Sequence, residues 1–172
     1  MCPTIEEYDS YAQDHPTWGM PYGMPNLSSN EYSTLMSWLQ NGAIMNAPIP
    51  LTLEQQALVE EYEQFFNNGS RKAQLTARYI YEHLFLSHLY FSELNETTPR
   101  FFTLVRSETP PGQPVKRIAT RRPYDDPNVD RVYYRFVPEQ ATIVDKTHMP
   151  FALNSQRINN WKAWFIDTTY DV

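Results

Sequence analysis

The first 70 residues contain no lysine and no arginine, although nine of them are acidic. Between positions 71 and 135, by contrast, eleven basic residues outnumber seven acidic ones. The balance of charge therefore changes sign along the chain, and its net charge is −6. This split predicts either a solubilising acidic half or two distinct surfaces, with the basic region meeting lipid phosphates or an acidic neighbouring domain.

Cysteine is almost absent, since Cys2 is the only one. A single cysteine excludes an internal disulfide, a multi-cysteine metal site and the Cys-x-x-Cys-His motif that attaches a c-type haem. No apolar run reaches the ~20 residues of a membrane span, and the first ten residues lack the apolar core of a signal peptide.

Several catalytic motifs are also missing. The sequence has no Gly-x-Ser-x-Gly, no glycine-rich phosphate loop and no His-Glu-x-x-His, which argues against the enzyme classes that use them. Basic and aromatic residues alternate at Arg131, Tyr133 and Arg135, as in some nucleic-acid-binding strands. The acidic net charge argues against that reading, so we expect no nucleic-acid partner.

The 172 residues are enough for one domain with a buried core, and 15% of them are aromatic. Capping boxes at Ser28-x-x-Glu31 and Thr52-x-x-Gln55 predict helices that run to about Asn41 and Phe66. Ser70 caps a third predicted helix, which we expect to continue to about Phe91.

The segment from Arg78 to Phe91 is apolar almost all the way round, so we expect it to be wrapped by protein or lipid. Leu84, Phe85 and Leu86 should therefore be largely buried. Its few polar residues are costly to bury and need an explanation.

After Asn95 the pattern changes to short β-branched and aromatic segments, which predict strands at 101–106, 115–120, 131–137 and 141–145. A last helix is predicted from Ser155 to Ile166. The predicted fold class is α+β, with three N-terminal helices, a short antiparallel β meander and a C-terminal helix. We expect residues 1–26 to form an extended lead-in and 27–172 a single domain, with a helical part (27–95), a strand-rich part (96–150) and a C-terminal helical part (151–172).

Several segments together resemble the bacterial fatty acid cis/trans isomerase family. The resemblance covers roughly residues 18–164 and is carried by Met20–Pro25, Arg78–Phe91, Leu104–Gly112, Ile118–Pro127 and Lys146–Pro150. It implies a periplasmic enzyme that converts cis double bonds of membrane-lipid acyl chains to trans, helping the membrane to adapt. It also implies a covalent haem c. Members of the family are longer, so we expect this chain to be an internal piece, inactive alone, whose partners are phospholipid acyl chains and the remaining domains.

The segment from Trp18 to Pro25 is similar to the loop that supplies an axial methionine in c-type cytochromes. Within the family reading, Met24, or as second choice Met20, is a candidate haem ligand because a thioether is a soft ligand for iron. The alternative is that both methionines fill gaps in the core.

Three histidines are further candidates. His83 and His88 lie about 140° apart on a helix, so they cannot bind one metal as an i, i+4 pair. They either face an acyl pocket or haem, as weak candidates for catalysis, or serve as core histidines with satisfied hydrogen bonds. His148 either contacts iron or an acyl chain, or anchors a loop.

Arg117, Arg121 and Arg122 form the densest group of charge. Arginine binds phosphate through its planar fork, so these residues are candidates for a phosphate or headgroup site. The alternative is a network in which they pair with Asp125 and Asp126 to hold the proline-rich turn.

Two other functional classes remain open beside the isomerase. The segment could be a non-catalytic, cytochrome-like or docking module, or a lipid-binding module without haem.

Overall fold

The computed structural model describes residues 3–19, 27–45, 47–141, 143 and 145–170. The chain divides into two compact units, Met1–Ala47 and Pro48–Val172. The second unit holds the sheet and every pocket discussed below. The assignment of domains at 1–26 and 27–172 stays a prediction.

The first unit contains helices α1 (Tyr8–Asp14) and α2 (Ser29–Gln40). Helix α2 begins at the predicted capping box, where the Ser28 hydroxyl accepts the Glu31 N–H and the Glu31 carboxylate accepts the Ser28 N–H. It ends before Gly42, whose φ of +88° suits glycine. The prediction of an extended lead-in is wrong for α1, where Tyr11, His15 and Trp18 pack their rings together.

The second unit begins with helices α3 (Leu53–Phe66) and α4 (Arg71–Leu84). Both start where the sequence predicts. Thr52 and Gln55 form the second capping box, and the Ser70 hydroxyl accepts the Ala73 N–H. These signals are reliable because a capping side chain acts within its own first turn.

Helix α4 ends at Leu84, so the prediction of a helix to Phe91 is wrong. The chain turns at Phe85 and Leu86 and then enters strand β1 (His88–Phe91). Leu84 is 8% exposed, as expected, but Leu86 is 63% exposed and Phe85 is only half-buried. No glycine or proline marks the change, and an apolar run of this kind fits a buried helix and a buried strand equally well.

Four strands form one mixed sheet in the order β3-β2-β1-β4. Strands β2 (Phe102–Ser107) and β3 (Tyr133–Pro138) confirm two predicted strands, and the pairs β1–β2 and β2–β3 are antiparallel. Strand β4 (Pro150–Leu153) pairs with β1 in parallel. The prediction of a purely antiparallel meander is therefore wrong.

Two predicted strands do not form. Segment 115–120 contributes only an isolated bridge between Arg117 and Ser107. The described residues of 141–145 contain no strand, and a 3-10 helix follows at Asp145–Thr147. Another 3-10 helix, Ser92–Leu94, follows β1.

The predicted C-terminal helix is present as α5 (Ser155–Trp161), continued by a π-helical turn at Lys162–Ile166.

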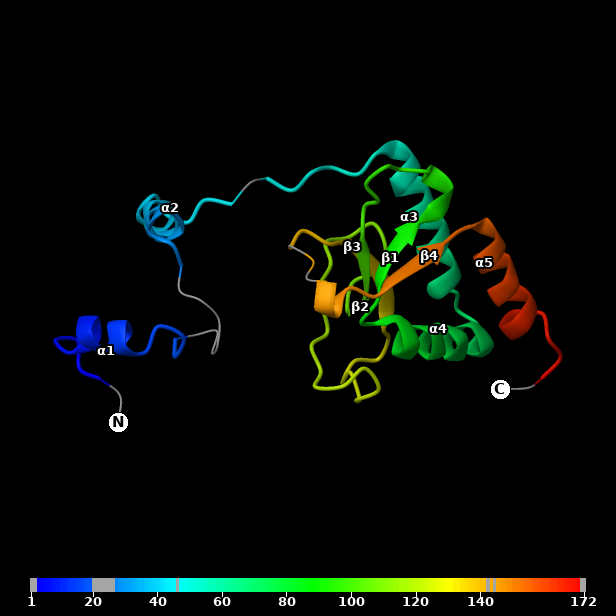
Figure 1. Ribbon diagram of the computed structural model, residues 1–172. Coiled ribbons are helices and arrows are strands. Elements are labelled where there is room, and N and C mark those ends of the chain that lie inside the picture. The colour runs from blue at the N-terminus through cyan, green and yellow to red at the C-terminus, as the bar shows by residue number, and fades with distance from the viewer. Residues whose placement is uncertain (1–2, 20–26, 46, 142, 144, 171–172) are drawn as a thin grey trace. The chain divides into compact units, whose positions relative to one another are not determined.

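The core lies between one face of the sheet and helices α3, α4 and α5, which gather on the same side of it (Figure 1). Alternate residues of the strands face these helices, as the two-residue period of a strand requires. The most buried side chains are Tyr62, Phe66, Leu89, Phe102, Leu104, Leu153 and Ile158.

Helix α3 also covers the free edge of strand β3. Glu63 accepts the Phe136 N–H, and Asn67 both accepts the Tyr134 N–H and donates to the Tyr134 carbonyl. These bonds satisfy backbone groups that an exposed edge strand would offer to another chain.

Candidate functional site

One hollow of the second unit contains all three arginines singled out in the sequence. It has a volume of about 350 Å³ and lies beside strand β2 and the end of helix α4. Its lining includes Arg117, Arg121 and Arg122 from the irregular segment 108–132, together with a fourth arginine, Arg106 of β2. The carboxylate in its lining is that of Glu139. We call it the arginine pocket.

The three predicted arginines do not form the network with aspartates that was the alternative reading. Within the described part of the chain, none of their guanidinium groups makes an ion pair. The Asp125 carboxylate instead accepts the backbone N–H of Arg122 at 2.9 Å, and Asp126 accepts that of Asn128. The aspartates thus shape the turn through backbone hydrogen bonds, while the Arg122 guanidinium lies 5.8 Å from the centre of the Tyr124 ring.

Arg106 differs from the other three because it is only 5% exposed. Its Nη1 donates to the Asp125 carbonyl at 3.0 Å, and its Nη2 donates to the Thr120 hydroxyl. Its Nε is buried without a hydrogen-bond partner. Arg106 is not among the predicted site residues, because the sequence marks it only as the end of a predicted strand. The one sequence signal of a special role is that Arg106 is a single charged residue in a predicted apolar strand.

Two buried tyrosines flank Arg106 on the core side of the sheet. The guanidinium lies 5.5 Å from the centre of the Tyr81 ring, and Tyr134 is its cross-strand partner. Burial raises the pKa of Tyr134 to about 12 and also raises that of Tyr81, while the positive charge of Arg106 opposes both shifts. Both phenols therefore stay neutral at ordinary pH and leave the charge of Arg106 uncompensated.

A second hollow, of about 380 Å³, is also lined by Arg106. Arg78 and both Asp125 and Asp126 contribute to its lining. Arg78 pairs with Glu82 one turn along α4, with Nε and Oε1 2.7 Å apart. This second hollow therefore carries mixed charge, whereas the arginine pocket is strongly basic.

The structure separates the two histidines of the predicted helix. His83 is exposed at the last turn of α4, where its Nδ1 lies 2.7 Å from the Tyr79 carbonyl oxygen. His88 lies in β1, half-buried, and its Nδ1 is 3.0 Å from the Nδ1 of His148. Parallel pairing of β1 with β4 brings these two imidazoles together across 60 residues, and Phe101 stands edge-on to both.

A hydrogen bond between two Nδ1 atoms requires one imidazole to donate and the other to accept. One imidazole of the pair thus carries a proton on Nδ1 and the other does not. Both interpretations of His88, as an acyl-chain contact and as a core histidine with a satisfied hydrogen bond, stay predictions.

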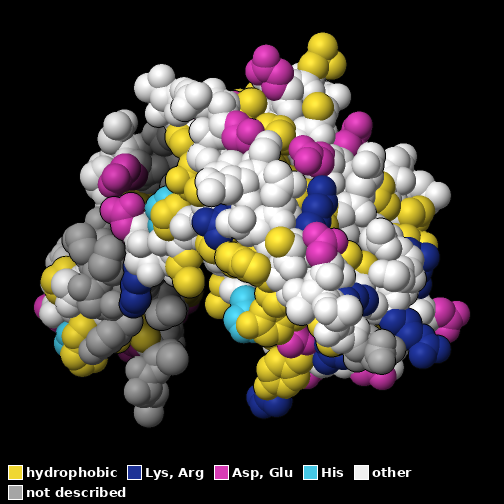
Figure 2. Space-filling view, turned by 90° about the vertical axis from the view of Figure 1, so that its right-hand side faces the viewer, with side chains coloured by type: hydrophobic (Ala, Val, Ile, Leu, Met, Phe, Trp, Pro, Cys, Tyr) yellow, Lys and Arg dark blue, Asp and Glu magenta, His cyan; other side chains and the backbone are white. Residues whose placement is uncertain are grey.

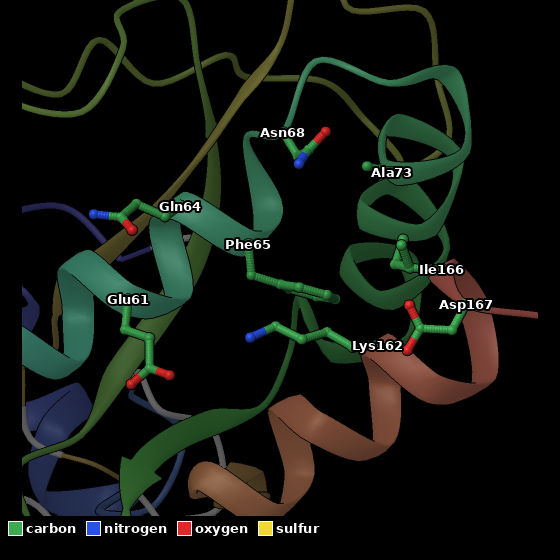
Figure 3. A pocket seen from close by; sticks show the side chains of 8 residues that line it. All are labelled: Glu61, Gln64, Phe65, Asn68, Ala73, Lys162, Ile166 and Asp167. Atoms are coloured by element: carbon green, nitrogen blue, oxygen red, sulfur yellow. The ribbon is translucent and has the colours of Figure 1, made fainter.

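A third hollow, of about 360 Å³, lies among α3, α4 and the π-helical turn. Figure 3 shows Phe65 pointing into it, with the side chain of Lys162 reaching across toward α3. Glu61 and Asp167 lie on its two sides, and neither is ion-paired with Lys162 in the described structure. The sequence does not predict this hollow, because its residues come from three separate helices.

Of the described helices, none is long and apolar enough to span a membrane. On the face shown in Figure 2, basic and acidic side chains are interspersed and the hydrophobic ones are scattered in small groups.

Comparison with known families decides the broad assignment. The family model described as fatty acid cis/trans isomerase (CTI) matches residues 1–172. The chain belongs to the fatty acid cis/trans isomerase family. No curated protein and no solved structure matches it.

The covalent haem attachment that the family resemblance implies does not fit the residues of this chain. Covalent attachment needs two cysteines and a histidine in one motif, and the sequence has Cys2 alone. Met20 and Met24, the candidate axial ligands, lie outside the described residues. Among the residues that the structure does describe, no group of three or more His, Cys, Asp or Glu side chains is placed to hold a metal ion.

Proposed function

We propose that this chain is part of an enzyme that converts cis double bonds in the acyl chains of membrane phospholipids to trans, and that its arginine pocket holds the lipid phosphate. Family membership supports the reaction class. The observation that carries the substrate assignment is the gathering of Arg117, Arg121 and Arg122 in one hollow, where none of them forms an ion pair with a described residue.

The chemistry of a phospholipid fits such a pocket. Its phosphodiester is a compact anion with oxygens that the planar guanidinium fork can bind in pairs. Anchoring the headgroup fixes how far along the acyl chain the protein meets the double bond. Positioning of this kind lowers the barrier to reaction without any chemistry at the anchor itself.

The remaining parts of the proposal rest on the family resemblance. We place the enzyme in the periplasm and the covalent haem on a part of the protein outside this chain. His88, paired with His148, and the exposed His83 are the proposed contacts for the acyl chain, and Met24 or Met20 the proposed axial ligand.

The test compares two substrates with the whole haem-loaded protein that contains this chain. Dioleoyl phosphatidylglycerol vesicles and free oleate are incubated separately, and the trans fatty acids are measured by gas chromatography of the methyl esters. The proposal predicts trans product from the intact phospholipid. Trans product from free oleate alone would contradict the substrate, and no trans product from either would contradict the reaction class.

A further inference from the structure

Two arginines of neighbouring strands are buried in the second unit, yet only one has a counter-ion. Arg135 of β3 binds the Glu63 carboxylate, with its Nε 3.0 Å from both oxygens, and also donates to the carbonyls of Pro110 and Gln113. Burial raises the pKa of Glu63, while the Phe136 N–H and Arg135 oppose that shift. The pair neutralises its own charge.

Arg106 of β2 has no such partner. Its guanidinium binds a carbonyl and a hydroxyl, its Nε is unpaired, and no carboxylate of the described residues forms an ion pair with it. Removing an ion from water is costly unless an opposite charge compensates it. Arg106 therefore leaves a positive charge at the wall of the arginine pocket that the described protein does not neutralise.

The surrounding loop holds this charge in a fixed place. The Thr120 hydroxyl that accepts from Arg106 itself donates to the Arg122 carbonyl, and the Ile118 N–H donates to the Arg106 carbonyl. Segment 118–125 thus folds around the buried guanidinium. The same segment carries the exposed Arg121 and Arg122 into the pocket lining.

The nearby carboxylates are engaged elsewhere. Glu139, which lines the pocket, accepts the backbone N–H groups of Gln140 and Ala141. Asp125 accepts the Arg122 N–H. These bonds fix both carboxylates at their turns, away from an ion pair with the pocket arginines.

We propose that the arginine pocket is a built subsite for a phosphate group, with Arg106 as its buried anchor and Arg121 and Arg122 as its rim. This rests on the proposed function for its biological ligand, the phosphodiester of a phospholipid, but free phosphate shares the same chemistry. An anion in the pocket compensates the charge of Arg106, and the exposed arginines supply charge-assisted hydrogen bonds.

Binding of phosphate to the 172-residue chain tests the subsite. Inorganic phosphate and the soluble phosphodiester dihexanoyl phosphatidylglycerol are titrated separately by calorimetry. Arg106→Gln is compared with Arg71→Gln, an exposed arginine that lines none of the three hollows. We expect Arg106→Gln to weaken binding about ten-fold or more, the usual effect of losing a charged hydrogen-bonding partner, and Arg71→Gln to leave it unchanged.

The two titrants separate the sources of the ligand. Tighter binding of the phosphodiester identifies a headgroup, and tighter binding of inorganic phosphate identifies a free phosphate; either supports the subsite. No binding of either at 10 mM overturns it. So does equal binding by the Arg106→Gln and wild-type chains, because Arg106 then only holds the loop.

A measurement on the wild-type chain covers the case in which Arg106→Gln does not fold. The Nε–H resonance of Arg106 is followed by NMR during the phosphate titration. We expect it to shift and saturate together with those of Arg121 and Arg122, and an unmoved Arg106 resonance overturns the anchor. Phosphate binding by a protein that makes no trans lipid would leave the subsite standing and remove the proposed function.

Discussion

At the scale of single residues, burial and pairing decide which charges are structural. Glu63 and Arg135 come from α3 and β3, 72 residues apart in the sequence, and form an ion pair in the interior, in which the Arg135 Nε–H is shared by both carboxylate oxygens. Arg106 is also buried, but its hydrogen-bond partners among the described residues are neutral groups. The first pair holds an element at the sheet edge, whereas the unpaired arginine is suited to binding an external anion.

Arg135→Met should therefore destabilise the chain by about 3–5 kcal/mol, because it leaves the Glu63 carboxylate buried without its partner. Chemical denaturation measures this change. In the double variant Glu63→Gln with Arg135→Met the loss should be much smaller, since the glutamine carbonyl can still accept the Phe136 N–H. If both variants lose the same stability, the ion pair is not what holds α3 against β3.

Tyr134 makes stability depend on alkaline pH. Its folded-state pKa is raised from 10.0 to about 12 by burial, so the folded chain keeps a phenol proton that the unfolded chain releases. The stabilisation that the buried Tyr134 phenol gives the folded chain is complete below pH 10 and is lost as pH rises from 10 to 12. The loss is on the order of 2–3 kcal/mol. Denaturation of wild type and Tyr134→Phe at pH 9 and pH 12 measures it, and an identical decline in both chains would contradict the assignment.

At the scale of elements, the sequence predicts helix starts better than helix ends. Ser28, Thr52 and Ser70 each cap a helix as predicted, because the capping hydrogen bond spans three residues. The end of α4 depends instead on strand β1 finding β4 some 60 residues later. Nothing local distinguishes that outcome from a longer helix.

The turn after α4 can be tested with two neighbouring leucines. Leu84 packs into the core at 8% exposure, whereas Leu86 is 63% exposed in the turn. Leu84→Ala should cost roughly 2–5 kcal/mol of unfolding free energy, and Leu86→Ala should stay within about 0.5 kcal/mol of wild type. Equal losses would show that the helix continues through Leu86 as the sequence pattern first indicated.

Site residues were predictable only where they lie close together in sequence. Arg117, Arg121 and Arg122 form a visible cluster, and the structure places them in one hollow. The register of β2 places Arg106 in the lining of that hollow, and the pairing of β1 with β4 places His88 next to His148. Sequence reasoning could not reach these last two arrangements because tertiary pairing alone creates them.

At the scale of the whole molecule, the chain belongs to the isomerase family but lacks the haem-attachment motif that the resemblance implies. The single Cys2 predicts that the purified 172-residue chain has no covalent haem. Its absorbance spectrum should therefore lack a Soret band, and the pyridine haemochrome assay should find no covalent haem. A stoichiometric Soret band that survives denaturation would contradict this prediction.

The proposed role of the arginine pocket is to bind the phospholipid on which the enzyme acts. Steady-state kinetics of the whole haem-loaded protein on dioleoyl phosphatidylglycerol vesicles tests it most directly. The variant combining Arg117→Gln, Arg121→Gln and Arg122→Gln should raise KM about ten-fold or more with little change in kcat, since the lost contacts serve binding. The matched Arg71→Gln protein should behave as wild type. An unchanged KM in the triple variant, or the same rise in Arg71→Gln, would contradict the claim.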